Sequence, residues 1–183
     1  MPLLCVYASS SLVLPEEEYA RADRLGRAFA TQGWDLIFGG ANIGIMNSVA
    51  RAMRAEGRRV VSVIPEIFNA RDLTFHDADE VLVTEDLRER KRVMQERADA
   101  FCVFPGGTGT LDEFYETLTL VQLRILVRPI VLLDFEEHFR GTIDQLAAID
   151  AGGYTKVPLL DIVRVARDEA EAVSVMRSVR EEA

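Results

Sequence analysis

Short apolar segments alternate with longer amphipathic segments along the whole chain. The apolar segments are rich in Val, Ile, Leu and Phe and have the length of buried strands, whereas the amphipathic segments repeat apolar residues at helical spacing. Regular alternation of the two is typical of βα units and of a parallel sheet. The pattern therefore predicts an α/β protein with a doubly wound parallel sheet and helices on both faces. The predicted strands are Leu3–Tyr7, Asp35–Phe38, Val60–Ile64, Glu80–Val83, Ala100–Phe104, Pro129–Leu133 and Ile162–Ala166.

The residues at the ends of the amphipathic segments support their assignment as helices. Three glutamates open the segment that starts at Glu16, where negative charge favours the positive end of a helix dipole. Asp86 is a predicted N-cap, with Glu89 three residues later in a capping-box arrangement. No repeat, linker or low-complexity segment divides the chain, so we expect one domain over residues 1–183. The predicted helices are Glu16–Gln32, Ile45–Glu56, Asp86–Arg97, Thr110–Leu126, Glu136–Ala151 and Arg167–Arg180.

Composition and charge narrow the classes of function. The chain has 183 residues, of which 49% are hydrophobic, and a formal net charge of −9. This charge argues against a broad nucleic-acid-binding surface. The sequence starts without a basic region ahead of a long apolar stretch, and no apolar run has the length of a membrane span. Cys5 and Cys102 lie inside apolar runs and are expected to be reduced core residues, so we expect a cytoplasmic protein with no membrane or nucleic-acid partner.

Few residues are available for several common catalytic chemistries. The chain contains two lysines, Lys91 and Lys156, and two histidines, His76 and His138. A Ser-His-Asp triad, a His-rich metal site and a pyridoxal phosphate Schiff base therefore have almost no candidates. We expect activity to need neither a metal nor an organic cofactor.

Three junctions between a strand and the following helix are candidates for ligand binding, because ligands of open α/β sheets bind outside the carboxyl ends of the strands. The most specific is Pro105–Thr110, in which Gly106, Gly107, Thr108, Gly109 and Thr110 lead into a helix. Such a loop exposes backbone N–H groups at the positive end of the helix, and phosphate is their natural occupant. The spacing matches neither a Walker A loop nor a dinucleotide fingerprint. A glycine-rich turn capped by Thr108 or Thr110 is the structural alternative.

The other two junctions carry weaker signals. Gly39 and Gly40 begin the junction that ends at Gly44, where glycines allow either ligand contact or close packing of strand and helix. Ser9 follows the first strand, but serines also serve as caps and turn formers.

Two charged residues strengthen the phosphate interpretation. Glu113 lies one turn into the helix after the glycine-rich loop. A carboxylate there would repel a bound phosphate unless the two groups have separate roles in the reaction. It is therefore a candidate for stabilising positive charge or activating water. Arg90 shares a helical stripe with Leu87 and Met94, so its guanidinium faces inward and requires an anionic partner. Substrate phosphate, Glu113 or a structural ion pair would meet that requirement.

The segments Arg90-Lys91-x-x-Met94, Asp99-Ala100-Phe101 and Pro105-Gly106-Gly107-Thr108-Gly109-Thr110-x-x-Glu113 resemble those of the Lonely Guy family. These proteins are cytokinin riboside 5'-monophosphate phosphoribohydrolases, and many carry the label lysine decarboxylase. The resemblance extends from about Cys5 to the last helix. It implies a Rossmann-like fold, homodimers with composite active sites, and release of the base from a nucleoside 5'-monophosphate such as AMP, with ribose 5-phosphate as co-product.

The resemblance also assigns roles to individual residues. Arg90 and Glu113 become catalytic, Lys91 stands beside Arg90, and the loop from Gly106 to Thr110 holds the phosphate. Asp72 and Thr119 align with two further positions of the family's site. The same site would include Gly39, Gly40 and Ser9.

Departures from the family pattern surround these positions. Ala41, Ile45 and Asn47 replace a glycine, a leucine and a glycine of the second junction, and Arg124 replaces a glycine near the end of the fourth helix. The Arg and Glu positions are intact, so the changes bear on the preferred base more than on the type of reaction.

Two other functions fit the same residues less well. One is a non-catalytic carrier of a nucleotide or of the molybdenum cofactor, whose phosphate would use the same loop without needing Glu113. The other is a structural oligomer with a vestigial site. We also expect at least a homodimer, because the segment Thr110–Leu126 is apolar on nearly every side.

Overall fold

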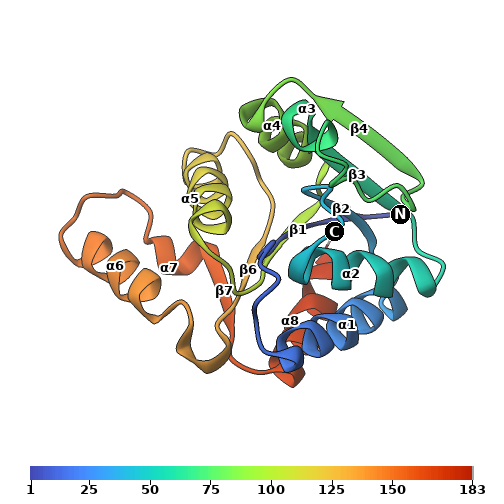
Figure 1. Ribbon diagram of the computed structural model, residues 1–183. Coiled ribbons are helices and arrows are strands. Elements are labelled where there is room, and N and C mark those ends of the chain that lie inside the picture. The colour runs from blue at the N-terminus through green and yellow to red at the C-terminus, as the bar shows by residue number, and fades with distance from the viewer. Residues whose placement is uncertain (183) are drawn as a thin grey trace.

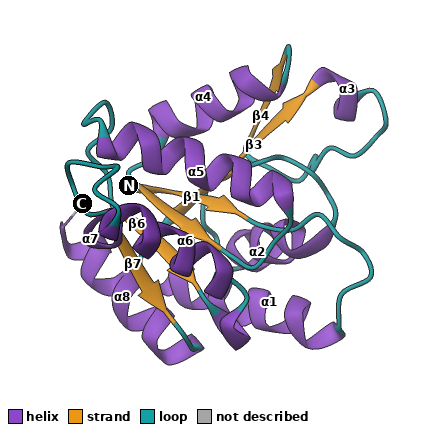
Figure 2. Cartoon of the chain, turned by 90° about the vertical axis from the view of Figure 1, so that its left-hand side faces the viewer, coloured by secondary structure: helices purple, strands orange, loops and turns teal. Residues whose placement is uncertain are grey.

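The computed structural model describes residues 1–182, in which a seven-stranded sheet lies between two layers of helices (Figures 1 and 2). All pairs of neighbouring strands are parallel, and the order is β4-β3-β2-β1-β5-β6-β7. The predicted doubly wound α/β fold is confirmed. The strands are β1 Leu3–Tyr7, β2 Asp35–Phe38, β3 Val60–Pro65, β4 Glu80–Thr84, β5 Ala100–Val103, β6 Ile130–Leu133 and β7 Val163–Ala166.

The helices separate into two groups because successive strand side chains point to opposite faces of the sheet. One face packs against α1, α2 and α8 around Phe29, Met53 and Met176. The other face packs against α4, α5, α6 and α7 around Phe114 and further buried side chains. The helices are α1 Glu16–Thr31, α2 Gly44–Ala55, α3 Glu66–Asn69, α4 Leu87–Arg97, α5 Thr108–Gln122, α6 Arg140–Ala151, α7 Leu159–Ile162 and α8 Glu169–Glu182.

Strand order reverses at β1, which pairs with β2 on one side and with β5 on the other. The chain builds outward from β1 to β4 and then crosses to β5, from which it builds outward to β7. Connections on the two sides of β1 consequently leave toward opposite faces. A crevice at the carboxyl ends of β1 and β5 results, which is the usual position of a ligand in this class of fold.

Several predicted boundaries of helices and strands differ from those in the structure. Helix α5 starts at Thr108 with Gly107 as N-cap and no side-chain cap, so neither Thr108 nor Thr110 caps it. The predicted helix Glu136–Ala151 is divided into a 3-10 turn, η1 (Phe135–Glu137), and α6. Ile162 ends α7 and does not belong to β7. The four-residue helices α3 and α7 were not predicted, since they are too short to show a periodic pattern.

The caps of α4 follow the prediction with one difference. The Asp86 carboxylate accepts hydrogen bonds from the backbone N–H groups of Arg88 and Glu89, both at 2.8 Å. The Glu89 carboxylate reaches back to the N–H of Glu85, rather than that of Asp86, at 2.8 Å. Among the helices of residues 1–182, none is long and apolar enough to cross a membrane.

Helix α5 ends four residues earlier than predicted because Arg124 turns the chain. Arg124 has a φ of 58°, in the left-handed region that usually contains glycine after a helix. The N–H groups of Ile125 and Leu126 both donate to the carbonyl of Leu120, at 2.9 and 3.2 Å. This turn leaves Leu123, Ile125 and Val127 61%, 66% and 76% exposed, and we call these three residues the α5 apolar patch.

Replacing Arg124 by glycine is expected to stabilise the protein. A left-handed conformation costs a non-glycine residue roughly 1–2 kcal/mol, so Arg124→Gly should raise the free energy of unfolding by about 1 kcal/mol. Urea unfolding at a single protein concentration measures the change. The matched control is Arg92→Gly inside α4, which should lower the same quantity by about 1 kcal/mol. A loss of stability in Arg124→Gly would contradict the prediction.

Candidate active site

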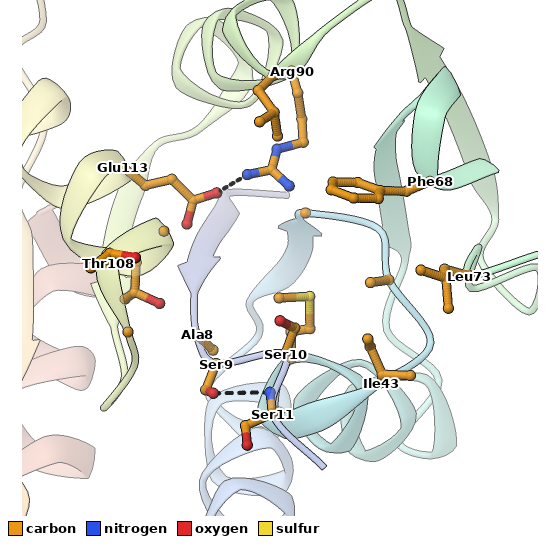
Figure 3. A pocket seen from close by; sticks show the side chains of 17 residues that line it. Ala8, Ser9, Ser10, Ser11, Ile43, Phe68, Leu73, Arg90, Thr108 and Glu113 are labelled. Atoms are coloured by element: carbon orange, nitrogen blue, oxygen red, sulfur yellow. Dashed lines mark hydrogen bonds and ion pairs between the residues drawn. The ribbon is translucent and has the colours of Figure 1, made fainter. Parts of the chain in front are cut away.

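The three predicted junctions meet around one pocket of about 470 Å³ at the carboxyl ends of β1, β2 and β5 (Figure 3). Ser9 follows β1, Gly39 follows β2, and Gly107 precedes α5 after β5. In Figure 3, Thr108 and Glu113 lie on one side of the pocket, and Phe68 and Leu73 lie on the other. The pocket therefore has a polar wall and an apolar wall.

The N-terminus of α5 supplies the polar wall. Its first N–H groups have no intrahelical partners, and Gly107, Thr108, Gly109 and Thr110 all line the pocket. A methyl group built on Gly107 or on Gly109 would meet no other atom of the described chain within 4 Å. The absence of side chains at these two positions therefore leaves open space in front of a helix N-terminus, as an anion site requires.

Gly106 has a different role from its neighbours. A side chain at this position would collide with the side chain of Thr110. Gly106 lines an adjacent cavity of about 480 Å³, which shares Ser9 and Gly107 with the first pocket. The loop from Gly106 to Thr110 thus separates two cavities, and only its later residues face the Glu113 pocket.

Glu113 and Arg90 form an ion pair at the inner end of the pocket. Nη2 of Arg90, on α4, donates a hydrogen bond to Oε1 of Glu113, on α5, and the two atoms are 2.5 Å apart. The two side chains are 13% and 8% exposed, whereas Arg88 and Arg92 on the same helix are exposed. A methyl group on Gly39 would lie 3.2 Å from Nη1 of Arg90. The glycine therefore gives the guanidinium room beside β2.

Burial controls the charge of Glu113. Desolvation raises the pKa of its carboxyl group to about 7, against the lowering effect of the Arg90 guanidinium. Asp112 raises the pKa further, and the Lys91 ammonium lowers it. The carboxyl group consequently exchanges a proton near neutral pH, as a group that accepts a proton during a reaction needs to do.

Lys91 points away from the pocket. Its ammonium group donates to Asp112 at 2.8 Å and also contacts Glu116, and its side chain is 9% exposed. Arg90 and Lys91, two adjacent residues of α4, thus bind three carboxylates of α5, those of Asp112, Glu113 and Glu116. The ammonium holds the two helices together instead of lining the pocket.

The chain matches the family model described as "Possible lysine decarboxylase" over residues 46–176. It is 40% identical to a cytokinin riboside 5'-monophosphate phosphoribohydrolase from Mycobacterium tuberculosis, covering 83% of this chain and 81% of that protein. A relative of the same name from Arabidopsis thaliana, LOG3, is 31% identical and is matched over 93% of this chain and 79% of its own length. The chain belongs to the Lonely Guy family.

A solved structure extends this relationship at the level of the fold. The molybdenum cofactor carrier protein of Chlamydomonas reinhardtii superposes with a TM-score of 0.74 at 22% identity, and the match covers 97% of both chains. The Lonely Guy fold and that of the carrier protein are therefore the same.

Besides Lys91 and Gly106, three residues that the family pattern assigns to the site do not line the pocket of this Lonely Guy chain. Asp72 has a side chain that is 97% exposed and lies 3.8 Å from His76. Thr119 is exposed on α5, and its hydroxyl donates to the carbonyl of Tyr115 at 2.8 Å. Gly40 has a φ of 79°, and its carbonyl accepts from the N–H of Phe75 at 2.8 Å. A side chain at this position would collide with Ser62, Val63 and Ile64 of β3, so Gly40 allows close packing of the backbone rather than contact with a ligand.

The apolar wall was missed by sequence reasoning. Phe68 lies on the four-residue helix α3 and Leu73 in the irregular segment that follows it, and neither stretch is long enough to show helical or strand periodicity. This segment is joined to the β2 junction by the hydrogen bond from Asn42 N–H to the Leu73 carbonyl, at 2.7 Å. The sequence offered one signal for these residues: they follow the carboxyl end of a predicted strand, where ligands bind in this class of fold. Further large apolar side chains that line the pocket are Ile43, Met46 and Leu87.

The raised pKa of Glu113 predicts a specific dependence of stability on pH. An unfolded glutamate has a pKa of about 4.3, so between about pH 4.3 and 7 the folded protein retains a proton that the unfolded chain releases. The contribution of Glu113 to the free energy of unfolding is therefore most favourable below this window and falls as the pH rises through 7.

Urea unfolding at pH 5 and pH 8 tests this prediction in the wild type and in Glu113→Gln, which cannot titrate. The stability of the wild type relative to the variant should fall from pH 5 to pH 8. Glu181→Gln, which changes an exposed carboxyl group of α8, is the control and should show little such dependence. An equal difference between wild type and Glu113→Gln at both pH values would show that the pKa of Glu113 is not raised.

Proposed function

We propose that the protein hydrolyses the N-glycosidic bond of AMP-like nucleoside 5'-monophosphates, including N6-modified ones, and releases the free base and ribose 5-phosphate. The observation that carries this proposal is Glu113, a carboxyl group that titrates near neutral pH one helical turn beyond an open, glycine-lined helix N-terminus. Relatives that are 31–41% identical and are named cytokinin riboside 5'-monophosphate phosphoribohydrolases support it.

The spacing along α5 suits such a substrate. Glu113 follows Thr108–Thr110 by three to five residues, which is a rise of roughly 5–8 Å along the helix. This is comparable to the length of ribose 5-phosphate between its phosphorus and C1'. A phosphate at the N-terminus of α5 therefore brings C1' toward the Glu113 carboxylate, and remote binding energy aligns the bond that breaks.

The proposed reaction consumes one water molecule. The bond between C1' and the base nitrogen breaks with its electron pair on the base, and positive charge develops on the ribose. The Glu113 carboxylate stabilises this oxocarbenium-like state, as carboxylates do in glycosidases. Water then bonds to C1', its proton passes to Glu113, and the departing base takes up a proton. Glu113 returns to its ionised form when it releases that proton to solvent.

The remaining residues would bind and orient the substrate. Arg90 holds the Glu113 carboxylate in place. It also supplies positive charge beside an anionic ligand, whose binding the net charge of −9 otherwise disfavours. The apolar wall that contains Phe68 and Leu73 would accept the base and its N6 substituent. Ser9, Gly39 and the N–H groups of α5 would contact the ribose and the phosphate. No metal or organic cofactor takes part in this proposal.

The label lysine decarboxylase does not fit the pocket. Pyridoxal phosphate chemistry of this kind requires a lysine that reaches the cofactor. Lys91 is engaged by Asp112 and Glu116, and Lys156 is exposed in the loop before α7. Neither residue lines the Glu113 pocket.

A non-catalytic carrier is the second candidate, favoured by the similarity of the fold to the molybdenum cofactor carrier protein. Such a carrier would use the N-terminus of α5 for a phosphate group but would have no use for a buried carboxylate beside it. Because burial of Glu113 is unfavourable for its ionised form, its position favours the hydrolase.

Two substitutions separate the roles of Glu113 and Arg90. Glu113→Gln removes the negative charge and keeps the shape, so the rate of base release from AMP should fall at least about 100-fold while AMP binding is retained or tightened. Arg90→Ala removes a cation and leaves Glu113 unpaired, so AMP binding should weaken about tenfold. Chromatographic assay of the released base and calorimetric titration with AMP provide the two measurements.

The controls are exposed neighbours on α4. Arg92→Ala and Glu96→Gln should leave both measurements unchanged. Cleavage of AMP by Glu113→Gln at near the wild-type rate would remove Glu113 from the mechanism. A wild-type protein that binds AMP but cleaves neither AMP nor its N6-substituted analogues would be a carrier.

We also propose that the protein is a cytoplasmic homodimer with the α5 apolar patch at its interface. The patch exposes three large aliphatic side chains just after the end of α5, and Thr119 lies exposed in the last turn of that helix, outside the pocket of its own chain. A second copy would cover the patch and bring Thr119 into an interface, in line with the composite sites that the family resemblance implies. The buried free thiols Cys5 and Cys102 suit a reducing compartment.

Light scattering at micromolar concentration is expected to give twice the chain mass of 20.5 kDa. The double substitution Leu123→Glu with Ile125→Glu places charges in the patch and should shift the protein toward the monomer. Val13→Glu, at a 91% exposed position elsewhere, is the matched control and should leave the mass unchanged. A monomeric wild-type protein would contradict the proposed dimer.

A further inference from the structure

The side chain of His138 contacts the backbone of the loop that precedes α5. Its Nε2 atom lies 3.1 Å from the backbone nitrogen of Gly106 and 2.9 Å from the carbonyl oxygen of the same residue. In the neutral ring with the proton on Nδ1, Nε2 accepts the N–H of Gly106, and with a proton on Nε2 the ring donates to the carbonyl. A single side chain from the β6–α6 connection therefore engages the glycine loop from the side opposite Glu113.

The connection that carries His138 adopts an unfavourable backbone conformation. Glu136 and Glu137 have φ values of 47° and 57°, in the left-handed region that disfavours non-glycine residues. Both residues immediately precede His138. Backbone strain of this kind persists only where surrounding contacts hold it, and it gathers at functional positions.

Three contacts hold this conformation. Arg21 donates two hydrogen bonds to the Glu136 carboxylate, at 3.0 and 2.7 Å. The buried Asp134 carboxylate accepts the backbone N–H of Phe139 at 2.7 Å. The Phe139 ring, 1% exposed, packs edge to face on the imidazole with ring centres 4.8 Å apart. These contacts orient the His138 ring toward Gly106.

Gly106 and Gly107, the two residues in front of α5, have no side chains that could hold their backbone in place. Glycine loses more conformational freedom on ordering than any other residue. On one side, Gly106 is limited by the Thr110 side chain. His138 supplies a contact on the other side. A loop ordered before the phosphate arrives loses less entropy on binding, so its affinity for phosphate is higher.

We propose that His138 is a positioning residue that orders Gly106 and Gly107, the loop in front of the N-terminus of α5, for binding of the 5'-phosphate. The identification of this loop as the phosphate site rests on the proposed function. His138 contacts neither Glu113 nor Arg90 in the structure, so it acts on binding of the phosphate and not on cleavage of the glycosidic bond.

The test compares His138→Phe with His138→Gln. Phenylalanine keeps an aromatic ring on Phe139 but cannot form the hydrogen bonds, whereas the glutamine amide can donate and accept at a similar reach. His138→Phe should raise the dissociation constant for ribose 5-phosphate, measured by calorimetry, about threefold to tenfold, as loss of one hydrogen bond predicts. KM for AMP should rise by the same factor with kcat within about twofold, and His138→Gln should restore both.

Adenosine, which lacks the phosphate, separates a positioning role from a structural one. Its binding should be the same in wild type and in His138→Phe. The matched control His76→Phe alters the other histidine, which is exposed, and should change none of these quantities.

Three results would overturn the proposal: unchanged binding of ribose 5-phosphate by His138→Phe, equal weakening of adenosine and AMP, or no restoration by His138→Gln. A wild-type protein that binds no ribose 5-phosphate would overturn it as well. Failure of the proposed function is a separate outcome. If the wild type binds AMP and ribose 5-phosphate without cleaving any nucleotide, the binding measurements still decide the role of His138.

Discussion

The single direction of all seven strands is the constraint on which the site depends. Because the strands are parallel, each one ends at the same edge of the sheet, and the segments that follow them collect there. Reversal of the strand order at β1 then opens a crevice between connections that leave toward opposite faces. Ser9, Gly39 and Gly107 are separated by up to 98 residues in sequence and line one pocket for this reason.

Two opposed electrostatic requirements meet in that pocket. An acidic protein needs local positive potential to attract a phosphorylated ligand, and the N-terminus of α5 and Arg90 supply it. The same pocket contains Glu113, whose ionised form is made unfavourable by burial and favourable by Arg90. The two effects together bring the pKa close to neutral. A carboxyl group in a more open position would be ionised at neutral pH and could not exchange a proton there.

The helices and loops around the pocket are held by interactions that do not touch a ligand. Lys91 links α4 to α5 through ion pairs with Asp112 and Glu116. The preceding residue of α4, Arg90, forms the ion pair with Glu113. On the far side of the glycine loop, His138 depends on Arg21 and Asp134 for its position. The residues that position the site therefore come from both layers of helices, although the pocket itself lies at one edge of the sheet.

The sequence by itself determined the class of fold and the position of every strand to within one residue at each end, and it selected Arg90, Glu113 and the glycine loop as the candidate site. These features follow from local patterns: alternation of apolar and amphipathic segments, glycines next to a helix start, and the helical stripe that turns Arg90 inward. Tertiary structure alone decided that Lys91 faces Asp112 rather than the pocket, and that Asp72 and Thr119 lie outside it. It also decided that Phe68 and Leu73 form the apolar wall and that His138 reaches Gly106. Each of these contacts joins segments that are distant in sequence or lack periodicity, so their distances depend on how the strands and helices pack and not on any spacing along the chain.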